Sequence, residues 1–296
     1  MATSVRPEPR VNLQGISALI VVLVSFAVLY REVIIKLVRD WSIDDNYSHG
    51  FLIVPLALFF VWERRAKLAA AAPARSMAGL ALVVLSFAVL AAGVLGSELF
   101  LMRASMLSMI AGIVLFLYGA RHLQILAFPI LFLLLMIPIP AIIFNQIAFP
   151  LQLIASRFGE MALTTLGIPV LREGNVIQLA NTSLEVAEAC SGIRSLISLM
   201  TLGIVYGYFI DPRIWMRFAL AIATIPVAIA ANGIRVAGTG VAAHYYGPEA
   251  AQGFFHSFSG WLVFISAFIL LFIIHRMFVL VWPAKADRKD LKGENL

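Results

Sequence analysis

Long apolar runs separated by short polar segments predict a series of membrane-crossing helices. Several windows of about twenty residues contain no charged side chain, which is the length that a helix needs to cross a hydrocarbon core. The chain is expected to contain eight such spans. They cover about Leu13–Tyr30, Gly50–Trp62, Ala78–Leu95, Leu99–Gly119, Leu123–Ile137, Gly192–Ile210, Phe218–Ala237 and Phe254–Ile274.

Three segments between these runs have a different pattern. Residues 31–49 are expected to form a polar loop. Residues 141–167 are apolar but interrupted by polar and charged side chains, which favours an interfacial or re-entrant helix. Residues 176–186 consist of two short β-prone segments around the turn-like sequence Ala-Asn-Thr-Ser, which predicts a β-hairpin before the sixth span.

The composition agrees with a polytopic membrane protein. Apolar residues make up 61% and charged residues 13% of the 296 residues, far from the values of a soluble domain. We therefore expect an all-α polytopic membrane protein with about eight transmembrane helices and a small extracytoplasmic β-hairpin before the sixth. It is expected to form a single integral membrane domain over residues 1–296 in the lipid bilayer, with flexible ends at about 1–12 and 284–296.

The positions of lysine and arginine predict the orientation. The net charge is +6, but the basic residues fall in short clusters between apolar spans, so no nucleic acid is expected as a partner. With both termini in the cytoplasm, most of these clusters lie inside. The same orientation puts the loop that ends at His49, the hairpin, Cys190, the end of span seven and the start of span eight on the extracytoplasmic face.

Cys190 is the only cysteine in the chain. It can form no internal disulfide and no cysteine metal cluster, so it is either a reactive thiol or a small apolar filler. Ser191 and Gly192 follow it, and an apolar run begins at Ile193. Cys190 is therefore expected where a helix starts, and free N–H groups at that end favour a thiolate.

Arg235 and His256 are expected at the same membrane level as the thiol. Arg235 lies near the outer end of span seven, where an arginine is costly unless it is paired or lines a polar cavity; snorkelling to the headgroups is the alternative. His256 opens span eight, and a satisfied interfacial histidine is the alternative there. A thiolate that attacks a carbonyl, a histidine that moves the proton and an arginine that holds the oxyanion or a carboxylate together predict acyl transfer.

The acidic and basic neighbours of the thiol leave the identity of the catalytic arginine open. Glu185 and Glu188 would raise the pKa of the thiol unless they are turned away to orient an arginine. Arg194 follows Cys190 by four residues and so shares its helical face. Arg194 and Arg235 therefore both remain candidates for the catalytic arginine.

His49, with Asp44 and Asp45, forms a second polar group on this face. These residues could bind a metal or supply a second base, but the favoured interpretation is that they cap span two. We expect no metal site and no cofactor. The chain has no glycine-rich nucleotide loop, and its Phe-rich and Met-containing spans are interpreted as lipid-facing or packing surface.

Four sequence strings resemble the exosortase/archaeosortase family of polytopic membrane cysteine transpeptidases. They occur in order as NYSHGFLIVP (Asn46–Pro55), EACSGIRSL (Glu188–Leu196), ANGIRV (Ala231–Val236) and FFHSFSGW (Phe254–Trp261). The resemblance implies that Cys190 is the nucleophile, Arg235 the transition-state arginine and His256 the general acid/base. Residues of the same strings expected to support the site or bind substrate are Arg194, Glu188, Asn232, His49 and Tyr47.

The resemblance also implies a substrate class and a location. The expected partners are secreted proteins with a C-terminal sorting signal, made of a Pro-Glu-Pro motif, a transmembrane helix and a basic tail. The enzyme is expected to cut near the motif and to pass the acyl group to an acceptor linked to exopolysaccharide or the cell surface. The expected location is the bacterial inner membrane, with the active site on the extracytoplasmic face.

A non-enzymatic transporter or scaffold of exopolysaccharide export is the alternative function. Arg235 and His256 would then line a polar path. Transporters usually carry polar residues on both sides of the midplane and often show internal repeats. In this chain the polar residues are expected to gather at one face.

Overall fold

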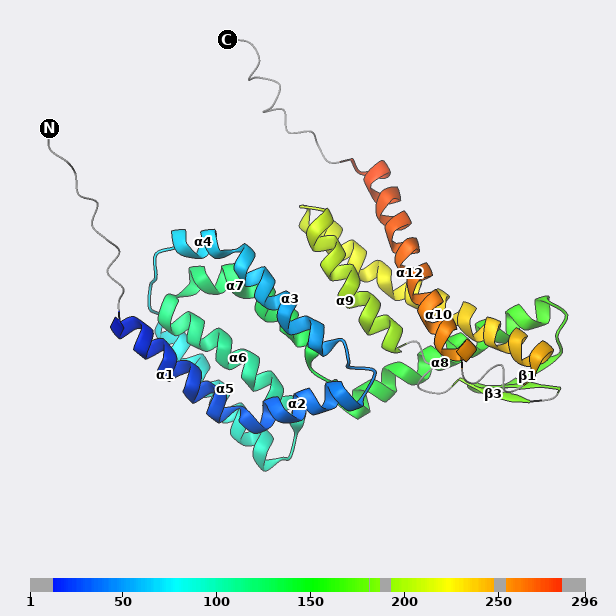
Figure 1. The fold of residues 1–296 in the computed structure, drawn as a ribbon, viewed down its shortest axis with the longest axis horizontal. Coiled ribbons are helices and arrows are strands. Elements are labelled where there is room, and N and C mark those ends of the chain that lie inside the picture. Colours follow the sequence, from blue (N-terminus) through cyan, green and yellow to red (C-terminus); the bar gives the residue numbers. More distant parts are fainter. Residues whose placement is uncertain (1–12, 181, 187–192, 248–253, 284–296) are drawn as a thin grey trace, which may run out of the picture. The chain divides into compact units, whose positions relative to one another are not determined.

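The computed structural model describes residues 13–180, 182–186, 193–247 and 254–283. The described chain is mainly helical, with one small sheet (Figure 1). It forms two compact units, residues 1–138 and 139–296, and each is described by itself. The expectation of one integral membrane domain stays a prediction, and the expected flexible ends lie outside the described residues.

Several helices have the length and composition of membrane spans. Among the described residues, five helices or helix segments are long and apolar enough to cross a membrane. The all-α polytopic membrane fold is therefore confirmed, while the number of spans stays a prediction. The five are Met77–Leu95, Leu99–Tyr118, Ala141–Thr165, Ile214–Tyr246 and Phe264–Val281.

The first unit contains a tight helical hairpin. The turn between α5 and α6 is closed by a hydrogen bond of 2.8 Å from the Glu98 N–H to the Gly93 carbonyl oxygen. The two helices lie side by side (Figure 1), as the short connection predicts. The elements of this unit are α1 (Leu13–Leu29), α2 (Arg31–Ile43), α3 (Gly50–Glu63), α4 (Arg65–Ala70), α5 (Met77–Leu95), α6 (Leu99–Tyr118), α7 (Ala120–Phe132) and the 3₁₀ helix η1 (Leu133–Met136).

The expected polar loop at residues 31–49 is wrong for most of its length, because α2 occupies it. Val33, Leu37 and Trp41 are spaced four residues apart and are buried on one face. Asp40, next to Trp41, forms an ion pair with the buried Arg103 of α6. The helix is thus stabilised by an apolar stripe and by a charge pair with α6.

The second unit contains the sheet and the longest helices. Its elements are α8 (Ala141–Thr165), β1 (Val170–Glu173), β2 (Val176–Leu179), β3 (Ser183–Glu185), α9 (Ile193–Ile210), α10 (Ile214–Tyr246) and α12 (Phe254–Val281).

α8 is one continuous helix. It continues through Pro150 and ends at Thr165. A re-entrant segment would reverse its direction within the membrane. The predicted re-entrant helix is therefore wrong. α8 also has the length and composition of a membrane-crossing helix.

The predicted β-hairpin is present but is part of a three-stranded antiparallel sheet in the order β1-β2-β3. β1 pairs with β2 so that Val170 lies opposite Leu179 and Glu173 opposite Val176. Ile177 and Leu179 are buried on the core face. β1 was not predicted, since its residues Val-Leu-Arg-Glu do not alternate between apolar and polar; Arg172 is half-buried and pairs with Glu160 of α8.

Glycines bring α8 and α10 into close contact. A Cβ added at Gly233 would lie 2.8 Å from the ring of Phe158, and one added at Gly240 would lie 2.6 Å from Leu163 Cδ1. Side chains of α8 thus fill the spaces beside glycines of α10. α10 extends to Tyr246, beyond the predicted end at Ala237, and measures roughly 50 Å.

Candidate functional site

Arg235 lies on the part of α10 that packs against α8. It is half-buried, and Asn232, one turn earlier, is only 3% exposed. The position of Arg235 near the outer end of span seven stays a prediction, and α10 itself continues for about three turns beyond Arg235. The extension is stabilised because Val236 and Ala243 share one apolar core with α8 and the sheet.

The apolar cores of the second unit show how α9 and α12 align with α10. Towards the start of α10, Met216 and Leu220 pack with Leu271 of α12. Further along α10, Ala231 shares a core with residues near the start of α9 and in the middle of α12. Those residues are Leu196 and Leu199 of α9 and Phe264 and Ala267 of α12. α9 and α12 therefore begin towards the Arg235 end of α10.

The three candidate catalytic residues are described to different extents. Cys190 and Glu188 lie outside the described residues, between β3 and α9. Arg194 is the second residue of α9 and is half-buried. His256 is the third residue of α12, and its side chain is not among those described. A contact among Cys190, Arg235 and His256 stays a prediction, as do the roles of Glu188 and Asn232.

The chain that leads to Cys190 is held at Val186. Its N–H donates to the carbonyl oxygen of Asn175 at 2.9 Å, which extends the β2–β3 ladder by one pair. The side-chain amide of Asn175 donates to the Val186 carbonyl oxygen at 3.3 Å and to Oε1 of Gln152 on α8 at 3.4 Å. Val186 is 2% exposed and lies in the same core as Val236, the neighbour of Arg235.

α8 also fixes the turn that carries Asn175. Ser156 is fully buried, and its hydroxyl donates to the carbonyl oxygen of Gly174 at 3.0 Å. Sequence reasoning missed Gln152, Ser156 and Asn175. The available signal was the spacing of Gln152 and Ser156, four residues apart on one face of an apolar helix.

His49 and Tyr47 belong to the first unit, in the turn before α3. Nε2 of His49 lies 3.1 Å from the carbonyl oxygen of Leu135, and Tyr47 is 7% exposed. Burial lowers the pKa of His49, and hydrogen bonds to the backbone of Leu135 and Asn46 oppose that shift. The imidazole is therefore neutral at neutral pH.

The expected capping of α3 by these polar residues is wrong. His49 occupies the N-cap position but makes no side-chain capping hydrogen bond. Oδ1 of Asp44 accepts the N–H of Asn46 at 2.9 Å, so Asp44 caps its own turn.

Comparison with protein families identifies the chain. A family model described as transmembrane exosortase matches residues 41–273. The chain belongs to the transmembrane exosortase family. No curated protein and no solved structure matches it. Within the exosortase region lie α3, the sheet, α9, α10 and most of α12, together with all four sequence strings.

A buried polar cluster lies at the opposite end of the exosortase helices. Asp211, between α9 and α10, accepts hydrogen bonds from Arg213, at 2.8 Å from the backbone N–H, 2.9 Å from Nε and 2.6 Å from Nη2. These bonds hold the pKa of Asp211 below its usual value of 3.8. Nε2 of His275 lies 3.8 Å from Asp211, and Tyr206 hydrogen-bonds to His275 Nδ1 at 2.8 Å. The expectation that polar residues gather at one face is therefore wrong.

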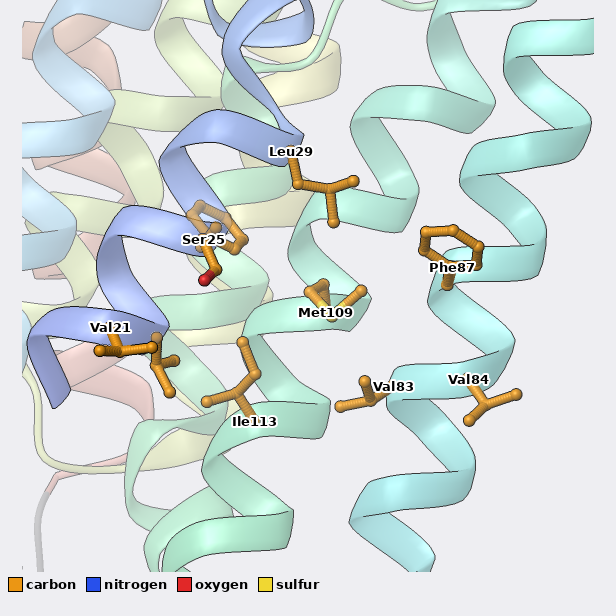
Figure 2. Close-up of a pocket in the computed structure, with 10 residues that line it drawn as sticks. Val21, Ser25, Leu29, Val83, Val84, Phe87, Met109 and Ile113 are labelled. Atoms are coloured by element: carbon orange, nitrogen blue, oxygen red, sulfur yellow. The ribbon is translucent and has the colours of Figure 1, made fainter. Parts of the chain in front are cut away.

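An apolar cleft of about 440 Å³ opens in the first unit between α1, α5 and α6 (Figure 2). Its lining includes no titratable side chain, so it supplies no acid, base or nucleophile. Among the described residues, no group of three or more histidine, cysteine, aspartate or glutamate side chains could hold a metal ion. The cleft is lined by Val21, Val22, Ser25, Phe26, Leu29, Val83, Val84, Phe87, Met109 and Ile113.

Proposed function

We propose that this exosortase is a membrane-embedded cysteine transpeptidase with Cys190 as nucleophile. One observation carries the proposal. The chain before Cys190 packs through Val186 into the core of Val236, and the chain after it packs through Leu196 into the core of Ala231. Both sides of the thiol are thus held against α10 on either side of Arg235.

The reaction follows from the chemistry of the three side chains. The Cys190 thiolate attacks the scissile carbonyl carbon, and the guanidinium of Arg235 donates hydrogen bonds to the oxyanion. His256 gives a proton to the leaving amine as the carbon–nitrogen bond breaks, which leaves a thioester. The acceptor nucleophile then attacks the thioester, His256 takes its proton, and the thiolate is released.

The substrates we propose are secreted proteins with a C-terminal signal of a Pro-Glu-Pro motif, a transmembrane helix and a basic tail. The helix would lie in the bilayer with its tail in the cytoplasm, so the acidic motif meets the extracytoplasmic face. Arg172 is paired with Glu160, at 2.6 Å from Nε to Oε2. The positive charges of Arg194 and Arg235, predicted on the same face, suit the glutamate of the motif.

Co-expression with such a substrate tests the proposal. Mass determination of the new C-terminus of the substrate should show cleavage near the motif in cells with the unaltered enzyme. Cys190→Ala and Cys190→Ser should both abolish processing while the protein keeps its yield and melting temperature in detergent. Native processing by either variant would rule out the thiol as nucleophile.

The proposed orientation has its own test. Reporters fused after Arg75 and after Arg213 should report the cytoplasm, and a reporter inserted at Asn181 should report the exterior. The opposite pattern would put Cys190 on the wrong side for secreted substrates.

A further inference from the structure

The register of β2 and β3 decides where the backbone groups of β3 point. The bond from the Val186 N–H to the Asn175 carbonyl oxygen marks a hydrogen-bonded pair of this antiparallel ladder. Such pairs alternate with non-hydrogen-bonded pairs. Leu184 therefore also bonds to β2, whereas the N–H and C=O groups of Ser183 and Glu185 point the other way. That side is an outer edge of the sheet, because the strand order is β1-β2-β3.

The edge at β3 is the one turned away from α8. β1 forms the other edge and lies beside α8, where Arg172 pairs with Glu160. The side chains of Ser183 and Glu185 are exposed, and Leu184 is half-buried. Within the part of the chain that the structure describes, no fourth strand pairs with β3.

We propose that an extended segment of the substrate polypeptide adds to this edge as a fourth strand. The inference rests on the proposed function, because a peptide substrate must present its scissile bond to Cys190. Cys190 follows Glu185 by five residues. A peptide paired with Ser183 and Glu185 is therefore bound beside the segment that leads to the thiol. Main-chain hydrogen bonds of this kind hold a peptide extended and supply affinity.

A Pro-Glu-Pro segment can pair with this edge only if its glutamate faces β3. Proline has no N–H to donate, and in sheets it is confined mainly to edge strands, with its nitrogen facing away from the ladder. The glutamate between two prolines is then the residue that directs both its N–H and its C=O at β3. The two prolines face the open side and prevent the addition of a further strand.

Binding of backbone-modified peptides tests the strand addition separately from cleavage. The probe is a fluorescent synthetic peptide that carries the Pro-Glu-Pro motif and its flanking residues, bound to full-length Cys190→Ala protein in detergent. N-methylation of the glutamate amide, and of non-proline amides at alternate positions from it, should weaken binding about 2- to 10-fold each. The same change at the intervening non-proline amides should leave the affinity unchanged.

Two variants at one position provide the matched comparison. Ser183→Pro removes an N–H that points away from β2, so we expect weaker peptide binding with an unchanged melting temperature. Ser183→Ala keeps that N–H and should bind the peptide as the parent does. If Ser183→Pro fails to fold, the N-methylated series on the otherwise unaltered chain decides alone.

The outcomes distinguish the strand addition at β3 from the role of Cys190 as nucleophile. Equal effects of N-methylation along the peptide, native affinity of folded Ser183→Pro, or no measurable binding of the parent peptide overturns the strand addition. Processing by Cys190→Ser instead overturns the assignment of the thiol and leaves the strand addition in place.

Discussion

Gly159 of α8 lies so close to Val236 of α10 that a Cβ on the glycine would be 2.7 Å from Val236 Cγ1. The same Cβ would be 3.0 Å from Cδ1 of Ile177 on β2. Helix α8, helix α10 and the sheet therefore meet at this glycine. Arg235 precedes Val236, so this contact also sets the position of the candidate catalytic arginine.

Gly159→Ala should destabilise the protein by about 1–3 kcal/mol, because the added methyl group overpacks a closed contact. We expect a lower melting temperature in detergent and slower substrate processing at temperatures where the protein stays folded. We expect slower processing because a displaced Val236 would also shift its neighbour Arg235. Thermal unfolding and turnover at matched expression check both effects.

The double variant Gly159→Ala/Val236→Ala is the control for this contact. It removes Cγ1, the atom nearest to the new methyl group, and leaves Val236 Cβ at 3.6 Å, an ordinary contact distance. The double variant should therefore be more stable than the sum of the two single changes predicts. Strict additivity would show that the glycine is not constrained by Val236.

Asn175→Ala should cost about 1–3 kcal/mol, because it leaves the buried Oε1 of Gln152 without its donor. It also removes one of the two hydrogen bonds that hold Val186. The measurements are the melting temperature and the rate at which a maleimide reacts with Cys190 in folded protein. We expect both to change, because Val186 precedes the thiol by only four residues.

Gln178→Ala is the matched control for Asn175→Ala. The Gln178 amide donates to Oε2 of Glu173 at 3.1 Å on the exposed face of the sheet. Its loss should change stability by less than about 0.5 kcal/mol. A change in thiol reactivity as large as that of Asn175→Ala would contradict a specific role for the Asn175 bonds.

Arg235→Lys should lose most of the proposed transpeptidase activity, because lysine keeps the charge but lacks the planar fork of donors. Loss of one oxyanion donor costs about a hundredfold or more in rate. Arg235→Ala should be at least as slow, whereas Arg194→Ala should retain more activity because we assign Arg194 to organising the site. Turnover is compared at matched expression and detergent stability. Near-native turnover of Arg235→Ala together with an inactive Arg194→Ala would reverse the two roles.

His49 predicts a pH dependence of stability. Burial lowers its pKa below the ordinary 6.5, so the unfolded chain takes up a proton at a higher pH than the folded chain does. Where the unfolded state binds more protons, stability rises with pH. The contribution of His49 is therefore complete above pH 6.5 and decreases as the pH falls from 6.5 to the lowered pKa.

Thermal unfolding of the parent and of His49→Gln across this pH range checks the prediction. The parent should lose more stability than the variant as the pH falls below 6.5, and the two curves should run parallel above it. Equal slopes at all pH values would show that His49 does not titrate differently in the folded state.

The local sequence determined several secondary-structure elements, the family and two of the candidate catalytic residues. The apolar runs predicted the helical hairpin of α5 and α6, the β2–β3 hairpin and the start of α9, because helix periodicity and turn chemistry act over a few neighbouring residues. The four strings predicted the family, which the match over residues 41–273 confirms. The unique thiol and the arginine of the ANGIRV string needed no tertiary information to be singled out.

Tertiary packing decided the presence of α2, the length of α10 and the hydrogen bonds of Asn175. α2 forms where a loop was expected because Val33, Leu37 and Trp41 are buried in a core. α10 extends past its predicted end at Ala237 because Val241 and Ala243 pack into the core that α8 and the sheet form. Gly174 and Asn175 form a local turn signal, but this signal does not show what the Asn175 side chain bonds to. The hydrogen bonds of the Asn175 side chain follow only from the tertiary structure. They depend on where Gln152 and Val186 lie in space and not on their spacing along the sequence.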